Sequence, residues 1–146
     1  MLSHQLLMDT LIAELSAAPM LVDGGISRQR ARPLPEVFTG AINVRILRSD
    51  PEPLAGIGAP ITWSTRVAFE CIGRASSSTA PDEVAAPVFE ALHLRLASSV
   101  VALAAAGFEL DLSPTLQWDQ DEQEDRIGAI VAIYNVRHST SPYTMT

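Results

Sequence analysis

The residues whose types and spacing could support chemistry gather near the C-terminus, in the segment WDQDEQEDRIGAIVAIYNVRH at positions 118–138. A calcium loop of the EF-hand type needs regularly spaced acids and a glycine at its sixth position. Counting from Asp119, the fifth position is Gln123 and the sixth is Glu124, so that motif is not met. The acidic run consists of five carboxylates within seven positions: Asp119, Asp121, Glu122, Glu124 and Asp125.

Paired carboxylates can also act as acid and base, but only where partial burial separates their pKa values. Five neighbouring acids with glutamines between them stay hydrated and repel one another, which disfavours that use. Three interpretations of the acidic run remain: a hairpin loop exposed to water, an electrostatic docking surface, and, least favoured, a metal or catalytic site. We expect it to be a wet turn that faces a partner.

Other candidate motifs are incomplete. The GIG at 56–58 lacks the third glycine and the following helix of a dinucleotide-binding loop, and no phosphate-binding loop or Gly-x-Ser-x-Gly elbow occurs. His4, His93 and His138 fall on different expected elements, and His93 is expected at the surface or an interface. The sequence therefore predicts no metal, no cofactor and no catalytic activity.

Cys71 is the only cysteine, which excludes an internal disulfide and a multi-cysteine zinc site and fits a reducing compartment. It falls on the apolar face of an expected strand, so we expect it in the core. A hydrolase that uses Ser64 or Cys71 with His138 would need side chains from different surfaces of the protein.

Composition indicates one ordinary domain. The chain has 146 residues, a net charge of -7 and a pI near 4.8, which argue against a nucleic-acid surface. The N-terminus has no basic region of a signal peptide. We find no apolar stretch of the ~18 residues that a membrane span needs, and expect a soluble protein that is intracellular at synthesis.

The first half of the chain alternates between regular elements and loops. Leu7, Leu11, Ile12 and Leu15 repeat at helical spacing after Ser3, a candidate N-cap, and Pro19 ends this helix. The remaining expectations are a short strand with an Asp-Gly turn at 20–25, a polar loop at 27–36, a strand at 41–48 and a Pro/Gly-rich loop at 49–60.

Residues 61–74, ITWSTRVAFECIGR, give the cleanest alternation of apolar and polar residues in the chain. At ~3.3 Å per residue this strand would be about 46 Å long, more than a small domain usually accommodates. Such a strand must bend, carry a bulge, or extend into a partner. Its polar face fits a sheet that is wet on its second side or covered only on assembly.

The second half begins with a helix capped by Thr79 or Ser78, in which Pro87 should cause a kink or move the start later. A second helical piece at 98–107, a strand at 108–112, the acidic run and a strand at 127–137 follow. The order of elements predicts a single α+β domain over 1–146, with an antiparallel or mixed sheet and two to three helices on one face. Residues 139–146 are expected to be a flexible tail.

This order of features resembles the tail terminator (tail completion) proteins of long-tailed bacteriophages and related tail-like particles. The likeness rests on the leading helix, VDGG, the strand TWSTRVAFECIGR, the segment STAPDEVAAPVFEALHLRL, LAAAGFELDLSPT, the acidic stretch and the closing RIGAIVAIYNVRH. It covers almost the whole chain.

The resemblance implies a ring-forming, hexameric, non-enzymatic protein of the virion, assembled in the host cytoplasm and placed at the head-proximal end of the tail. Such a ring caps the tail tube, ends tube polymerisation, and joins a head-completion or connector protein. Long strands are then explained, because neighbouring subunits can cover what one subunit exposes. We expect the acidic run either to serve as an electrostatic contact or to line the lumen of the ring. The arginine loop of Arg28, Arg30 and Arg32 is expected to offer a complementary patch. The alternative is a small-ligand-binding or regulatory α+β domain that uses the groove between sheet and helices.

Overall fold

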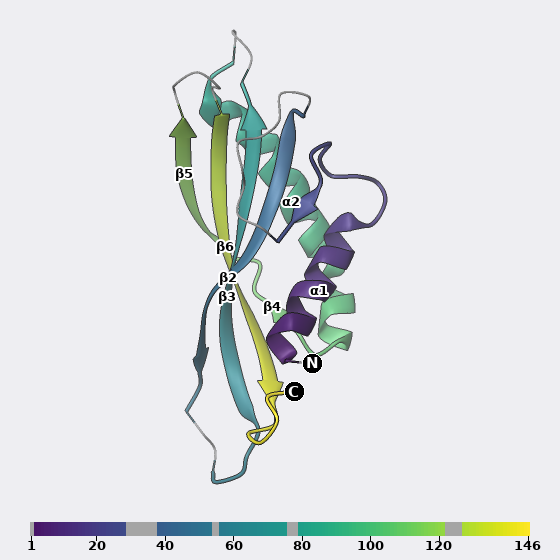
Figure 1. Ribbon diagram of the computed structural model, residues 1–146, viewed down its shortest axis with the longest axis vertical. Coiled ribbons are helices and arrows are strands. Elements are labelled where there is room, and N and C mark those ends of the chain that lie inside the picture. Colours follow the sequence, from purple (N-terminus) through teal and green to yellow (C-terminus); the bar gives the residue numbers. More distant parts are fainter. Residues whose placement is uncertain (1, 29–37, 54–55, 76–78, 122–126) are drawn as a thin grey trace.

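The computed structural model describes residues 2–28, 38–53, 56–75, 79–121 and 127–146 (Figure 1). Within them the chain forms two helices and six strands, in the α+β order expected from the sequence. These are α1 (Ser3–Ser16), β1 (Ile26–Ser27), β2 (Gly40–Pro51), β3 (Ile61–Arg74), α2 (Pro81–Ala105), β4 (Glu109–Leu110), β5 (Thr115–Asp121) and β6 (Ile127–Thr140).

The six strands form one mixed sheet in the order β1-β2-β3-β6-β4, and β5 also pairs with β6. Only the β1–β2 pair is parallel. The sheet is built around β3 and β6, which pair without interruption from Ile61 opposite Thr140 to Arg74 opposite Ile127. The far edge of β6 is shared, since β5 pairs with its first half and β4 with two residues of its second half.

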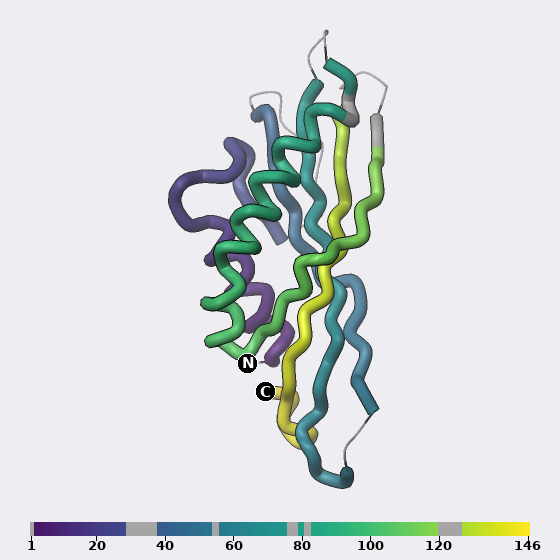
Figure 2. The backbone as a smooth tube through the Cα atoms, turned by 180° about the vertical axis from the view of Figure 1, so that it is seen from behind, coloured from purple at the N-terminus to yellow at the C-terminus, as the bar shows by residue number. Residues whose placement is uncertain are grey.

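Both helices lie on one side of the sheet, as expected (Figures 1 and 2). Alternation along β3 and β6 places one set of side chains against the helices, and these form the centre of the core. Phe69 and Tyr134 meet there edge to face, with ring centroids 5.4 Å apart. The helices contribute a fully buried leucine set: Leu7, Leu11 and Leu15 from α1, and Leu92, Leu96 and Leu103 from α2.

The helices begin and end differently from the sequence expectation. The N-cap of α1 is Leu2 and that of α2 is Ala80, and neither makes a side-chain capping bond, so capping by Ser3 or Thr79 is wrong. Ser78 lies outside the described residues. The two expected helical pieces are one helix of 25 residues that contains Pro87. A proline is tolerated here because its ring is exposed and the helix is held from one side by the sheet.

A guanidinium group satisfies the carbonyls at the end of α1. Arg95 of α2 donates to the carbonyl oxygens of Glu14 (3.2 Å), Ala17 (2.8 Å) and Pro19 (2.6 Å). Positive charge is favourable at a helix C-terminus, where the last carbonyls lack partners within the helix. Arg95 thus fixes the two helices to one another.

The Asp-Gly turn is present, but the strand expected before it is not. Asp23 lies in a turn, and its carboxylate accepts hydrogen bonds from the backbone N–H groups of Thr39 and Gly40 at 2.9 Å. These bonds, from Thr39 first, lower the pKa of Asp23. The short strand follows the turn, at Ile26–Ser27, because the capped turn directs the chain alongside β2.

The length of the central strands is accommodated by strong twist and by an irregularity in β2 (Figure 1). The β2–β3 register shifts between Ile46 and Arg48, which leaves Leu47 as an extra residue. The β2–β3 hairpin extends beyond the helices as an arm, and Ile57 near its tip is fully exposed (Figures 1 and 2). The segment expected as a tail begins within β6, and the Met145 carbonyl accepts the Ser3 N–H at 3.1 Å.

By length and composition α2 qualifies as a helix able to cross a membrane, over Glu83–Ala105 with a mean hydropathy of 1.5. The expectation that no apolar stretch is long enough is therefore wrong by this criterion. The criterion allows two charged residues in a window of 18, so Glu90 and Arg95 do not exclude α2. Core helices of soluble proteins meet the same criterion, and α2 packs Leu92, Leu96 and Leu103 against the sheet.

Gly73 permits the closest approach of helix to sheet. A Cβ at this position would overlap the backbone carbonyl of Val84 in α2, which cannot move away as a side chain could. We expect Gly73→Ala to lower the free energy of unfolding by about 1–3 kcal/mol, the usual cost of overpacking a core. The matched control is Gly56→Ala, since a Cβ there has no atom within 4 Å. Denaturant unfolding of both variants measures the difference; equal stability would contradict this account of the contact.

Candidate functional site

The acidic run begins on a strand, not in a loop. Asp119 lies on β5 opposite Ala129 and is exposed, and Asp121 is the last residue of β5, opposite Ile127. This corrects the expectation of a loop starting at 119; pairing with β6 extends β5 into the charged sequence. Glu122, Glu124 and Asp125 lie outside the described residues. Strands β5 and β6, which flank these residues in the sequence, pair antiparallel.

The structure does not bring Arg28 to the described part of the acidic run within one chain. Arg28 follows β1, at the opposite end of the strand order from β5, and pairs with Asp9 of α1 at 3.0 Å. Both side chains of this pair are about half exposed, so the pair adds little stability. Arg30 and Arg32 lie outside the described residues. Any contact between Arg28 and Asp119 would have to join separate copies.

A buried network of hydroxyl and imidazole groups links α1 to the sheet, and sequence reasoning missed it. His4 Nε2 lies 2.8 Å from Ser49 Oγ, which lies 2.7 Å from Thr65 Oγ1. Thr65 Oγ1 lies 2.8 Å from His138 Nε2, and His138 Nδ1 lies 3.1 Å from Ser3 Oγ. The two imidazole rings meet edge to face, with centroids 4.7 Å apart.

The number of protons in this network fixes its protonation state. Two hydroxyl groups lie between two ring nitrogens, so three hydrogen bonds need two hydroxyl protons and one imidazole proton. We infer that the ring Nε2 atom at one end of this chain donates and the Nε2 atom at the other end accepts, and that both rings are neutral. An additional proton would leave one donor without an acceptor. The remaining nitrogen, His4 Nδ1, is buried and has no partner within the described residues.

Burial and the neighbouring His4 lower the pKa of His138 to about 4, with burial the larger cause. Burial also lowers the pKa of His4. His138 is only 3% exposed, and the rings of Trp63 and Phe108 lie around the pair. The network is therefore built to stay neutral and to hold the N-terminus of α1 against β3 and β6.

The network is not arranged as a hydrolytic site. Ser64 alternates to the opposite face of β3 from Thr65 and therefore cannot reach His138. His138 lies opposite Trp63, eight positions along β3 from Cys71, roughly 26 Å away. Cys71 is fully buried, as expected for a core residue, and burial raises its pKa to about 12.

His93 is less exposed than expected. Its Nδ1 lies 2.7 Å from the Tyr134 hydroxyl, and its ring stacks against Tyr134 and touches Phe89. It therefore joins α2 to β6 within the domain.

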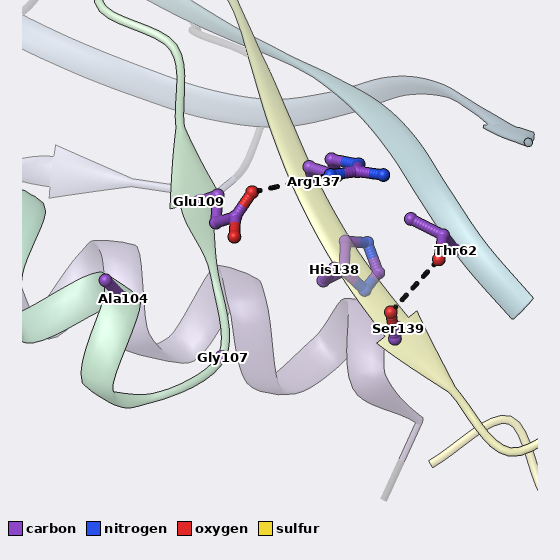
Figure 3. Close-up of a pocket in the computed structure, with 7 residues that line it drawn as sticks. All are labelled: Thr62, Ala104, Gly107, Glu109, Arg137, His138 and Ser139. Carbon is purple, nitrogen blue, oxygen red and sulfur yellow. Dashed lines mark hydrogen bonds and ion pairs between the residues drawn. The ribbon is translucent and has the colours of Figure 1, made fainter. Parts of the chain in front are cut away.

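An ion-pair cluster lines two hollows where β4 meets β6. Figure 3 shows the first of them, with Glu109 of β4 facing Arg137 of β6. Arg137 donates two bonds of 2.9 Å to the carboxylate of Glu52 and lies 3.8 Å from that of Glu109. The bond from Arg137 lowers the pKa of Glu52, and the same bond raises that of Arg137. The hollows have volumes of about 460 and 400 Å³, and Glu109 and Arg137 line both.

The main charged side chains of these hollows already pair with one another, so the hollows offer a ligand few unpaired charged groups. In the part of the chain that the structure describes, no group of three or more His, Cys, Asp or Glu side chains could hold a metal ion. A third hollow of about 460 Å³ lies between the sheet and the start of α2, lined by Asp23, Arg74, Glu83 and neighbouring residues. The Asp23 carboxylate there is already bonded to Thr39 and Gly40.

Apolar side chains without an internal partner are exposed on opposite sides of the domain. On the outward side of α2, Leu94 is 71% exposed and Val101 is 80% exposed. On the sheet side away from the helices, Ala129, Val131 and Ile133 of β6 are partly exposed. Large apolar patches of this kind are typical of interaction surfaces.

No protein-family model matches the sequence, and a search of curated proteins finds no match.

The low pKa of His138 predicts a pH dependence of stability. The unfolded chain takes up a proton near pH 6.5 and the folded chain only near pH 4, so stability from this group is complete above pH 6.5 and falls as the pH drops toward 4. Unfolding in this pH range is accompanied by proton uptake. We expect His138→Gln to lower that uptake by up to one proton per molecule. Urea unfolding of both proteins at several pH values measures it. An unchanged pH dependence in the variant would show that His138 is not the group responsible.

Proposed function

We propose that the chain is a structural subunit that caps the tail tube of a long-tailed bacteriophage or tail-like particle as a hexameric ring. In this role it ends tube polymerisation, contacts the tube protein on one side, and offers the other side to a head-completion or connector protein. It works in stoichiometric amounts, without a cofactor or a catalysed reaction, at the head-proximal end of the tail after assembly in the host cytoplasm.

The observation that carries the proposal is the contrast between a closed interior and two open outer faces. Among the described residues, His4 Nδ1 is the one buried side-chain polar atom without a partner, and groups such as those of the His4–His138 network are paired. Outward apolar side chains such as Leu94 and Val101 stay exposed. A subunit whose faces are completed by neighbours requires this distribution, whereas a ligand-binding domain requires unpaired polar groups that converge on a pocket.

The order and length of the elements also support the proposal. A leading helix, long central strands, one long helix and a closing hairpin with an acidic end follow the order of features in the resemblance. The β2–β3 arm, with exposed Ile57 near its tip, and exposed Tyr143 give that end of the molecule an apolar contact point for another protein (Figure 1). Apolar groups that water surrounds on all sides gain most from burial in an interface.

The test is a tube-polymerisation assay with the tail-tube protein encoded in the same genome. Addition of this protein is expected to stop elongation at one end, visible in electron micrographs as tubes that carry a single terminal ring. Tubes that elongate at the same rate and without a terminal ring at saturating concentrations would contradict the proposal.

The acidic run is expected to contribute an electrostatic contact in this assembly. Asp119→Lys with Asp121→Lys reverses two charges on the edge strand β5, so we expect folding to be retained and capping to be lost, because opposite charges become like charges at the contact. Far-UV circular dichroism and the tube assay measure the two effects. The control is Asp111→Lys, an exposed acid outside the run. Normal capping by the double variant would remove the acidic run from the contact.

A further inference from the structure

The outward side of α2 forms a continuous face that no part of the described chain covers. Glu90, Leu94, Ala97 and Val101 follow one another at spacings of four, three and four residues, so they lie on one side of the helix, and all four are exposed. We call these four residues the α2 outer face. The opposite side of the same helix buries Leu92, Leu96 and Leu103 against the sheet.

The sheet has a complementary face on the other side of the domain. Alternation places Arg66 of β3 and Ala129, Val131 and Ile133 of β6 on the side turned away from both helices. We call these residues the outer sheet face. Its apolar centre is partly exposed and Arg66 is exposed at its border. In the described chain no helix or strand packs over these β6 residues (Figures 1 and 2).

Glu90 on the α2 outer face and Arg66 on the outer sheet face carry opposite charges. The outer sheet face is also bordered by Glu70, which lies opposite Val131 and pairs with Arg45, and by Asp119, which lies opposite Ala129. Within the described residues neither Glu90 nor Arg66 takes part in an ion pair, in contrast to Arg45, Arg48 and Arg137. An exposed acid beside an apolar stripe and an exposed arginine beside an apolar strand match in chemistry. Complementary charges of this kind set the register and orientation of an interface.

The spacing of charge and apolar centre also matches. Glu90 and Val101 are eleven residues apart in α2, which corresponds to ~16 Å along the helix axis at a rise of 1.5 Å per residue. On the sheet, Arg66 lies opposite Asn135, four residues from Val131, roughly 13 Å along the strand. When Glu90 lies near Arg66 of another molecule, Val101 therefore lies over the apolar centre around Val131 and Ile133.

We propose that the α2 outer face of one copy packs on the outer sheet face of the next copy, with Glu90 beside Arg66. Because the two faces are different and lie on opposite sides of the domain, each copy offers both, and the contact is head to tail. Such contacts form a ring when the rotation between copies closes and a filament when it does not. The inference deepens the proposed function, because it names the contact by which the proposed ring is held together.

Disulfide trapping tests the contact directly. A chain with Val101→Cys and Val131→Cys cannot join these sites within one molecule, since they lie on opposite sides of the domain, but can join them between copies. Native Cys71 does not interfere because it is fully buried. Under mild oxidation at high protein concentration we expect a ladder of covalent oligomers on non-reducing gels, and the loss of the ladder on reduction.

The controls separate this contact from other associations. Neither Val101→Cys nor Val131→Cys alone should yield more than traces of dimer, and an equimolar mixture of the two should yield dimer and no ladder. Val101→Cys combined with Ser113→Cys, an exposed position outside the proposed contact, should give no ladder. Absence of the ladder in the main variant overturns the proposal, as does efficient dimer formation by Val101→Cys alone, which would indicate packing of α2 on α2.

Charge exchange provides an independent measurement. Glu90→Arg or Arg66→Glu alone should weaken self-association about tenfold or more in analytical ultracentrifugation, because like charges then meet. A chain with both substitutions restores an opposite pair at every contact and should recover most of the affinity. Failure of the double variant to recover overturns the assigned register.

The outcomes distinguish this inference from the proposed function. Rings seen by electron microscopy without the Val101–Val131 ladder would reject the contact and leave tube capping intact. A ladder together with unimpeded tube elongation would establish the contact and reject the terminator function.

Discussion

The unbroken pairing of β3 with β6 is the constraint on which the rest of the structure depends. Fourteen residues of each strand pair in one register, and a shift of one residue would turn every inward side chain to the opposite face. This ladder positions Phe69, Tyr134 and Thr65 toward the helices and Arg66 and Val131 away from them. The core, the buried network and the outer sheet face thus all follow from one register.

The two sides of the β3–β6 ladder have different surroundings. On the inner side, α1 and α2 seal the core, and the His4–Ser49–Thr65–His138 chain leaves only one imidazole nitrogen unpartnered among the described residues. Buried polar networks are costly unless nearly every member is satisfied, so this one indicates a rigid attachment of α1 and not a reactive site. On the outer side, apolar side chains of β6 stay partly exposed within a single chain.

Local patterns predicted the elements that are controlled by local sequence. The strand over 61–74 has the bounds that its alternation indicated, and the repeat of Leu7, Leu11 and Leu15 placed α1. The fold class and the position of the helices on one face followed from the order of these elements. Cys71 was correctly placed in the core for the same reason.

Features that depend on distant residues were not accessible from the sequence. Ser3 has the type and position of an N-cap, but its hydroxyl bonds to His138, 135 positions away, so tertiary contact replaced capping. The network joins side chains from four separate segments of the chain. Its residue types are common, and no spacing in the sequence indicates that they meet. Strand β5 extends into the acidic run because Leu116 and Trp118 pair opposite Ala132 and Ile130, and ladder formation outweighs the charge. Of the expected contact residues, Arg28 and Asp119 lie at opposite ends of the strand order, which is compatible with contact only between copies.

The central claim is that the domain is one subunit of a closed ring whose outer faces are covered by its neighbours. Native mass spectrometry over a range of protein concentrations, with negative-stain images of the largest species, tests it most directly. The account predicts a species of six copies that appears as a ring with a central opening and dissociates to monomers on dilution. A chain that remains monomeric at every concentration, or that stops at a two-fold dimer, would contradict it.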